Sequence, residues 1–390
     1  MSKAKHAPLP EIRLKVRMQG RRARYFKKQC ARPGGSLPAG SMVFVRDREG
    51  RPVGTALYNP RSEITLRILD HGSKAAPQTL ILDRLERALD FREEILGLRR
   101  GGTAYRLVHA EGDGLPGFVL DRCGEYLVAE ISCKGMEAFL EEIGARLRRR
   151  YPKGRLVLRV DAKAADREGL ECRPTPLDVE AELEENGIRY LFRPGGRHKT
   201  GFFCDQRENR LEFGRMASGR RVLDLCCHAG GFAMQAARGG ARSVLAVDLD
   251  EEALALCRKN AARNGLRVSV RHADAFAFLK DCPKGAFDLA VLDPPKWVPD
   301  RTSWERGLRR YLDLNARAMT KVAKGGFLLS CSCSGAVDEE TFLGILRRAA
   351  ERAGRSFRIL RCTGAGPDHP VDLACPETRY LKAVWLQARD

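Results

Sequence analysis

Short apolar runs alternate with longer amphipathic stretches over residues 222–387 of the chain. The short runs are continuously apolar, as buried strands are, whereas the longer stretches place their apolar residues at helical spacing. Regular alternation of buried strands with helices predicts a mostly parallel sheet covered by helices on both faces. The predicted strands begin near residues 222, 244, 268, 289 and 326, two more follow at 357–360 and 380–387, and the predicted helices span 251–264, 306–322 and 339–352.

The pattern before residue 196 predicts two smaller domains. Residues 1–73 contain four short strand-like runs, which predict a small β-barrel, and residues 74–195 mix strands with helices, which predicts a small α+β domain. Residues 196–390 then form the α/β domain. The expected strands are 12–16, 41–46, 52–57 and 63–69 in the barrel and 105–110, 117–121, 126–131, 156–160 and 187–194 in the middle domain, with helices at 78–98 and 136–149. A further helix, at 211–217, is expected to lead into the first strand of the α/β domain.

The strand at 222 leads into a glycine turn, Val222-Leu-Asp-Leu-Cys-Cys-His-Ala-Gly-Gly-Phe232. Gly230 and Gly231 permit backbone angles and close approaches that a side chain would block. Such a turn places backbone N–H groups and a helix N-terminus at the sheet edge, where α/β folds bind ligands. The turn lacks the full G-x-G-x-x-G spacing of dinucleotide-binding folds, so by itself it fits an ordinary strand–helix connection equally well.

Acidic residues at the ends of successive predicted strands favour a cofactor site. Asp248 ends the second strand, Asp274 follows the third, and Asp293 ends the fourth in the segment Asp293-Pro-Pro-Lys296. A carboxylate at the end of the second strand can accept both hydroxyls of a ribose. The pattern therefore predicts a nucleoside-bearing cofactor that lies across the strand tips.

Two cysteines follow the apolar run 327–329, in the segment Gly325-Gly-Phe-Leu-Leu-Ser-Cys-Ser-Cys-Ser-Gly335. A thiol at a strand tip beside a cofactor is a candidate nucleophile, although a cysteine is more often a small buried hydrophobe. We expect Ser334-Gly335 to break the strand, so that Cys333 lies at the tip beside Asp293 on the neighbouring strand. Cys331 is expected to be packing, as are Cys226, Cys227, Cys257 and Cys362.

Charge and composition limit the class of protein. The 390 residues carry a formal net charge of +20, which attracts polyanions and favours nucleic acid as partner. The basic stretch 21–28 fits either an RNA-binding insertion or a solvated charged helix. The 13 cysteines include no C-x-x-C pair, which argues against a zinc ribbon and a disulfide framework and suits a reducing cytoplasm. We expect no metal site, no signal peptide and no membrane span. The expected localisation is cytoplasmic.

Several motifs together resemble those of class I S-adenosylmethionine-dependent methyltransferases, and more closely the bacterial family that forms 5-methylcytidine in 23S rRNA. The resemblance covers residues 103–390, and Val43 to Leu69 is compatible with the PUA domain, an RNA-binding β-barrel, with which that family opens. The matching segments are Glu111-Gly-Asp-Gly-Leu-Pro-Gly117, Lys199-Thr-Gly-Phe-Phe-Cys-Asp-Gln-Arg207, Gly230-Gly-Phe-Ala233, Asp248, Asp293-Pro-Pro-Lys296, Ser332-Cys-Ser-Gly335 and Asp368-His-Pro370.

The resemblance implies a cofactor, S-adenosylmethionine, and roles for named residues. Asp248 is expected to hold the ribose and Asp274 the adenine amine, while Gly230 and the backbone near Asp224 approach the methionine part. A second group is expected to close over the cofactor or the base. That group consists of Phe202, Asp205 and Gln206.

The implied reaction begins with addition of the Cys333 thiolate to carbon 6 of cytosine, which makes carbon 5 nucleophilic toward the methyl group. Asp293 would bind the N3/N4 edge of the base and stabilise the developing charge. Lys296 occupies a position where related RNA enzymes carry a second cysteine, so the base that removes the carbon-5 proton stays unassigned. The expected partner is 23S rRNA or a large-subunit assembly intermediate, and monomer and homodimer both stay open.

Two other functions fit parts of the sequence. An Asp-Pro-Pro motif followed by an aromatic residue serves enzymes that methylate exocyclic amines without a covalent intermediate, and here Trp297 lies one position beyond Lys296. A non-catalytic RNA-binding or ribosome-assembly protein could keep the same fold. The joint presence of Asp248, Asp293 and Cys333 argues against the non-catalytic alternative.

Overall fold

The computed structural model describes residues 8–72, 77–194 and 201–390, which form two compact units. The first unit comprises residues 1–179, 193–202 and 368–378, and the second comprises 180–192, 203–367 and 379–390. The chain therefore enters the second unit at residue 180, returns to the first over 193–202 and again over 368–378, and ends in the second.

The amino-terminal part of the first unit is a small β-domain, as predicted. Its described residues form a five-stranded sheet of order β1-β3-β4-β5-β2, with a core that includes Val43, Val45 and Leu66. Within the basic stretch 21–28, β2 pairs with β5 and Tyr25 is buried, so the alternative of a solvated helix is wrong. The strands are β1 (Glu11–Arg13), β2 (Arg24–Tyr25), β3 (Met42–Arg46), β4 (Pro52–Tyr58) and β5 (Leu66–His71).

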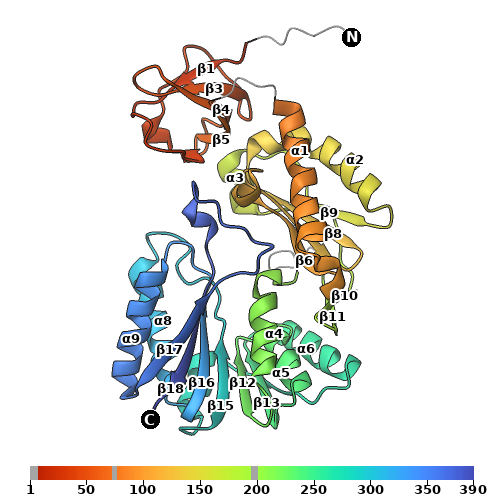
Figure 1. Ribbon diagram of the computed structural model, residues 1–390, viewed down its shortest axis with the longest axis vertical. Helices are drawn as coiled ribbons and strands as arrows, with labels where there is room; N and C mark the ends of the chain where they lie inside the picture. Colours follow the sequence, from red (N-terminus) through yellow and green to blue (C-terminus); the bar gives the residue numbers. More distant parts are fainter. Residues whose placement is uncertain (1–7, 73–76, 195–200) are drawn as a thin grey trace. The chain divides into compact units, whose positions relative to one another are not determined.

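The second sheet of the first unit has the order β6-β7-β8-β9, and helices α1 and α2 contribute to its core (Figure 1). The helix expected at 78–98 is α-helical only to Asp90, because a π-helical turn, Phe91–Ile95, follows and points Arg92 inward. A short helix after β9, α3 (Ala162–Glu168), was not predicted. The other elements are α1 (Pro77–Asp90), β6 (Ala104–His109), β7 (Phe118–Cys123), β8 (Tyr126–Ile131), α2 (Leu140–Arg150) and β9 (Arg155–Val160).

A buried polar network joins the two sheets of the first unit. The Arg67 guanidinium contacts the Glu111 carboxylate at 3.0 Å and the Glu168 carboxylate at 3.2 Å. Asn59 and Ser62 also donate to Glu168, so the charges of this carboxylate and of Arg67 are both satisfied. A buried pair with complete partners is stable only in one geometry, which fixes the β-domain against its neighbour.

A second network ties the segment 368–378 into the first unit around His109. Arg106 donates to Nδ1 of His109 at 3.1 Å, and because arginine can only donate, Nδ1 accepts and Nε2 carries the proton toward the Thr378 carbonyl. Burial, together with the positive charge of Arg106, lowers the pKa of His109 to about 2. The network therefore holds a neutral histidine.

The first unit is expected to lose stability in mild acid because of His109. Its folded pKa lies below the unfolded value of about 6.5, so only the unfolded chain takes up this proton as the pH falls. Between about pH 7.5 and about pH 5.5 this uptake lowers the free energy of unfolding by about 1.4 kcal/mol. Urea unfolding at both pH values should show this decline, and His109→Gln should reduce it; equal declines in both proteins would contradict the prediction.

The described residues of the second unit form the predicted α/β fold, a seven-stranded sheet of order β14-β13-β12-β15-β16-β18-β17. The pairs from β14 to β16 are parallel, whereas β18 runs antiparallel to both of its neighbours. Helices α4, α5 and α6 lie on one face and α8 and α9 on the other (Figure 1). The strands are β12 (Arg221–Leu225), β13 (Ser243–Asp248), β14 (Ser269–His272), β15 (Phe287–Leu292), β16 (Val322–Ser332), β17 (Phe357–Thr363) and β18 (Lys382–Ala388).

The helices of the second unit follow the predicted pattern with two additions. The expected helices correspond to α4, α6, α8 and α9, whereas α7 and the strand β10 were not predicted because both are short. β10 forms a hairpin with β11, and its Glu185 receives a buried ion pair from Arg210 of α4. The elements are β10 (Ala181–Glu185), β11 (Ile188–Phe192), α4 (Arg207–Arg215), α5 (Gly231–Arg238), α6 (Glu251–Arg263), α7 (Ala275–Asp281), α8 (Trp304–Met319) and α9 (Glu339–Ala353).

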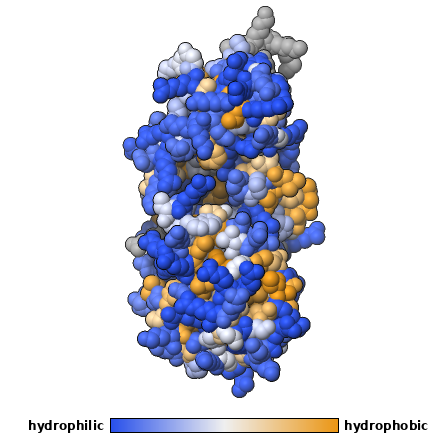
Figure 2. All heavy atoms as spheres, turned by 90° about the vertical axis from the view of Figure 1, so that its left-hand side faces the viewer, coloured by the Kyte–Doolittle hydropathy of each residue, from blue (hydrophilic) through white to orange (hydrophobic). Residues whose placement is uncertain are grey.

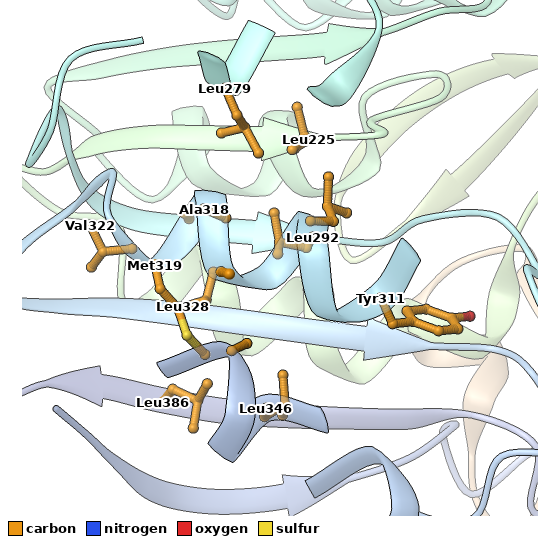
Figure 3. Close-up of a cluster of buried hydrophobic side chains, with 14 of the residues drawn as sticks. Leu225, Leu279, Leu292, Tyr311, Ala318, Met319, Val322, Leu328, Leu346 and Leu386 are labelled. Atoms are coloured by element: carbon orange, nitrogen blue, oxygen red, sulfur yellow. The ribbon is translucent and has the colours of Figure 1, made fainter. Parts of the chain in front are cut away.

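The core between the sheet and helices α8 and α9 is apolar and well filled (Figure 3). Leu292 and Leu328 from the sheet pack with Met319 of α8 and Leu346 of α9. Close packing of this kind holds neighbouring strand ends in a fixed relation. The sheet edge formed by the ends of β12, β13, β15 and β16 is therefore a rigid platform.

One face of the molecule is shown as spheres in Figure 2. Hydrophilic side chains dominate the face seen in Figure 2, in keeping with the net charge of +20. Within the described ranges, no helix is both long and apolar enough to span a bilayer. The same ranges contain no cluster of His, Cys, Asp and Glu suited to a metal ion, and none of the 13 cysteines forms a disulfide.

Candidate active site

The turn between β12 and α5 has an unusual backbone. Gly230 adopts a φ of 83°, and Cys226 and His228 adopt left-handed φ values of 64° and 48°. A Cβ added at Gly230 would lie 2.5 Å from the Cys257 sulfur, so glycine is required here both by conformation and by packing. Left-handed backbone at non-glycine residues is strained and gathers at functional sites. The two strained residues were not predicted, since neither residue type indicates a positive φ.

Asp224, the fourth residue of β12, is fully buried beneath this turn. Its Oδ2 accepts a hydrogen bond from the Ala233 N–H at 2.8 Å, whereas no described residue donates to Oδ1. Burial, reinforced by Asp293 and Asp248, raises the pKa of Asp224 to about 7. A buried carboxyl oxygen that lacks a donor is costly unless a ligand group supplies one, which fits a cationic or hydrogen-bonding group bound at the turn.

Asp248 joins the turn to the end of β13. Its Oδ2 accepts from the His228 N–H at 2.8 Å and its Oδ1 accepts from the Asp250 N–H at 2.9 Å. Each carboxylate oxygen has a second lone pair, so the group can still accept two hydroxyls. Asp248 is half-buried at the strand tip, where the sequence predicts a ribose to bind.

Asp274 is the N-cap of α7. Its Oδ1 accepts from the N–H groups of Phe276 and Ala277 at 2.9 Å and 3.1 Å. This structural role was not considered in the sequence analysis, and it leaves Oδ2 of the exposed side chain for other contacts. The structure therefore gives Asp274 a capping function whatever it binds.

Asp293 and the two cysteines lie at the adjacent ends of β15 and β16. The strands pair in parallel with Leu292 opposite Ser330, so continuing the register by one residue places Asp293 opposite Cys331. Cys333 therefore lies at the tip of β16, as expected, but two residues beyond the level of Asp293, because β16 runs further than its partner strand. Cys333 is the first residue beyond β16 and is half-buried, while Cys331 is fully buried within it.

The burial of Cys331 makes it a poor nucleophile. Burial, together with the charge of Asp293, raises the pKa of Cys331 well above its ordinary value. Cys227 and Cys257 are likewise buried, which confirms the expectation that they are packing residues. Cys226 and Cys362 are half-buried, and burial raises the pKa of both thiols, so neither is a ready thiolate.

Hydrogen bonds join the segment after Asp293 to the segment around Cys333. The Ser334 hydroxyl accepts from the Val298 N–H at 3.1 Å and lies 2.9 Å from the Tyr311 hydroxyl. Lys382, the first residue of β18, donates to the Ser334 carbonyl at 2.6 Å. Lys382 was missed in the sequence analysis, although a lysine between Leu381 and Ala383 in an apolar strand is a detectable signal.

The segment before α4 brings two further predicted residues to the same part of the second unit. Asp205 is buried and accepts from the Tyr380 hydroxyl at 2.6 Å. The buried Gln206 amide oxygen accepts from Asn209, and Gln206 acts to lower the pKa of the Cys331 thiol. Phe202 is buried and belongs to the first unit, so its part in binding stays a prediction. Lys199 and Thr200, which open the motif Lys199–Arg207, lie outside the described residues.

Two family models match the chain. The model of the S-adenosylmethionine-dependent methyltransferases matches residues 154–378. The model of the PUA-like domain matches residues 17–71 and confirms the nature of the amino-terminal sheet.

Relatives and solved structures agree with these matches. The chain is 36% identical to the ribosomal RNA large subunit methyltransferase I of Aeromonas hydrophila, over 93% of this chain and 94% of that protein. It is 34% identical to the protein of the same name from Vibrio cholerae, over 92% of this chain and 93% of that protein.

A candidate SAM-dependent methyltransferase from Streptococcus mutans shares the fold, with a TM-score of 0.76 and 19% identity over 90% of this chain and 93% of that one. A candidate methyltransferase that was solved with bound SAH gives a TM-score of 0.78 at 19% identity, over 90% of this chain and 93% of that one. The chain therefore belongs to the S-adenosylmethionine-dependent methyltransferases that carry a PUA-like domain, and S-adenosylmethionine is its cofactor.

Proposed function

We propose that this protein methylates carbon 5 of a cytidine in 23S rRNA through a covalent bond to Cys333. The observation that carries the proposal is the position of Cys333, a half-buried thiol just past the end of β16, which pairs with β15, the strand that Asp293 directly follows. The relatives that cover nearly the whole chain are named as ribosomal RNA large subunit methyltransferases, which supports ribosomal RNA as substrate. The net charge of +20 suits a polyanionic partner.

The residues of the chain perform the steps on the base. S-adenosylmethionine supplies the methyl group as an electrophilic sulfonium when it is bound. The Cys333 thiolate adds to carbon 6, which makes carbon 5 nucleophilic. Asp293 binds the N3/N4 edge of the base and stabilises the charge that develops there. After methyl transfer a base takes the carbon-5 proton, and the electron pair of that C–H bond forms the double bond between carbons 5 and 6. The bond from sulfur to carbon 6 breaks at the same time, which restores the thiolate.

The residues at the strand tips fit the cofactor. Asp248 would accept the ribose hydroxyls, Asp274 would accept from the adenine amine through its second oxygen, and Asp224 offers a buried oxygen without a described donor. The turn at Gly230 would lie against the methionine part, and a last group would cover the site. That group consists of Phe202, Asp205 and Gln206.

Replacement of Asp248 by asparagine is expected to weaken cofactor binding by about 10- to 100-fold, because each lost hydrogen bond to a charged acceptor is worth about 1.5–3 kcal/mol. Isothermal titration with S-adenosylmethionine measures this change. Asp288→Asn is the matched control, since this carboxylate lies at the start of β15 and binds Arg221. An Asp248→Asn protein that binds the cofactor like the control would remove the ribose assignment.

Nucleoside analysis tests the proposed function. Unmodified 23S rRNA or large-subunit assembly intermediates are incubated with the protein and S-adenosylmethionine, and the digested nucleosides are identified by mass spectrometry. The proposal predicts 5-methylcytidine at one site. A base methylated on an exocyclic amine would assign the Asp293-Pro-Pro segment to the alternative chemistry, and RNA binding without any methylated product would favour a non-catalytic role.

A further inference from the structure

Lys382 is a buried cation that forms no ion pair with a carboxylate in the described part of the chain. Lys382 is the first residue of β18, and only 2% of its surface is exposed. Its Nζ donates to the Ser334 carbonyl at 2.6 Å and to the Tyr380 carbonyl at 2.8 Å, and it forms no ion pair with a described carboxylate. Two neutral carbonyls do not balance the buried positive charge of the Lys382 ammonium, so we expect an anion beside it.

The candidate for this anion is the Cys333 thiolate. Cys333 directly precedes Ser334, whose carbonyl Lys382 binds, and Ser332 pairs with Lys382 across β16 and β18. Burial lowers the pKa of Lys382 to about 8. Of the neighbouring charged groups that raise this pKa, Cys333 has the strongest effect. Asp338 acts with Cys333, while Lys296 and Arg379 oppose them. Tyr311 and Cys331 are further titratable groups that interact with Cys333.

We propose that Lys382 is the positioning residue of the nucleophile: it holds Cys333 as a thiolate and fixes the segment that carries it. Transfer of the Cys333 thiol proton to the Lys382 amine gives the resting pair of an ammonium and a thiolate. No electrons are exchanged and no further reactant is needed. The proposal deepens the proposed function, because it explains how Cys333 becomes nucleophilic near neutral pH.

A matched comparison residue lies at the opposite end of β16, the strand that Cys333 directly follows. Lys321 immediately precedes β16, is 8% exposed, and donates to the Cys282 carbonyl at 2.6 Å. Burial raises the pKa of Cys282, and Lys321 acts to lower it. The two lysines are therefore alike in burial and bonding, but each lies near a different cysteine.

The pH dependence of alkylation of the full chain by iodoacetamide, without RNA or cofactor, tests the proposal. Mass spectrometry of the peptides follows each cysteine separately. In the unaltered protein, Cys333 is expected to reach half of its maximal rate at least about one pH unit below an ordinary thiol at about 8.5. A midpoint at or above that of an ordinary thiol would overturn the proposal without any variant.

Two substitutions separate an electrostatic role from a structural one. Lys382→Met is expected to slow alkylation of Cys333 at about pH 7 by about tenfold or more and to raise its midpoint, while Cys282 is unchanged. Lys321→Met is expected to slow alkylation of Cys282 and to leave Cys333 unchanged. An unchanged Cys333 profile in a folded Lys382→Met protein would overturn the proposal. If that variant does not fold, the profile of the unaltered protein decides alone.

The alkylation result is independent of methylation. An acidic Cys333 in a protein that forms no 5-methylcytidine would refute the proposed function and leave the pairing of Lys382 with Cys333 standing. Formation of 5-methylcytidine with an ordinary Cys333 profile would refute the pairing and leave the function standing.

Discussion

Replacement of Cys333 by alanine is expected to reduce methylation of 23S rRNA by at least about 10⁴-fold, because the reaction has no other way to activate carbon 5. The thiol lies beyond the end of β16 and is half-buried, so its loss should leave the fold and the cofactor site intact. Single-turnover methylation with labelled S-adenosylmethionine measures the loss, and titration of the cofactor checks that binding is unchanged.

Cys331→Ala is the matched control for this experiment. Cys331 is two residues away on the same strand, fully buried, and has a raised thiol pKa, so its removal should change the rate by less than about tenfold. Loss of activity in Cys331→Ala with retention in Cys333→Ala would exchange their roles. Retention of activity in both variants would exclude a covalent cysteine mechanism.

Replacement of Asp293 by asparagine is expected to lower the rate of methyl transfer by about 10²- to 10³-fold. The amide has nearly the same shape but cannot give a proton to N3, where addition of the thiolate to carbon 6 places negative charge. Because the carboxylate acts in the transition state, the rate constant should fall while the apparent affinity for rRNA changes little. Single-turnover rates at several RNA concentrations separate the two effects.

Asp274→Asn serves as the comparison for Asp293→Asn, since it is another strand-tip acid that lies outside the reacting centre in this account. It is expected to retain most of the rate at saturating cofactor. An Asp293→Asn protein that weakens RNA binding and leaves the rate constant unchanged would make Asp293 a binding residue only.

Much of the fold could be predicted from local pattern. The strands at β12, β13, β15 and β16 are continuously apolar because both faces of a parallel sheet are buried, and this pattern is visible without any partner. The amphipathic helices between them are long enough to show their period. The PUA-like sheet was also predicted, although its second strand was not, because Arg24 and Tyr25 lie in a basic stretch.

The parts that were missed depend on contacts between distant residues. β10 and α7 are too short for a period, and their formation depends on the Arg210–Glu185 pair and on the cap at Asp274. The register between β15 and β16, which puts Cys331 rather than Cys333 level with Asp293, cannot be read from one strand alone. The position of Lys382 against the Ser334 carbonyl depends on antiparallel pairing of β18 with β16.

The acids at the strand tips were found in sequence because parallel strands bring their carboxyl ends to one edge. What the sequence did not reveal is that Asp224 is buried with an oxygen that no described residue satisfies. Burial and hydrogen bonding are properties of the packed sheet, and the same residue type elsewhere in the chain is a cap, as at Asp274, or a surface ion pair.

The central claim is a covalent bond between Cys333 and carbon 6 of the target cytidine, and trapping of that bond tests it most directly. Substrate RNA with 5-fluorocytidine at the target position is incubated with the protein and S-adenosylmethionine. Because fluorine cannot leave as the carbon-5 proton does, the adduct should persist after methyl transfer. The account predicts an RNA-linked peptide that contains Cys333, dependent on S-adenosylmethionine and absent in Cys333→Ala. Full methylation of ordinary RNA with no adduct, or an adduct on another cysteine, would contradict it.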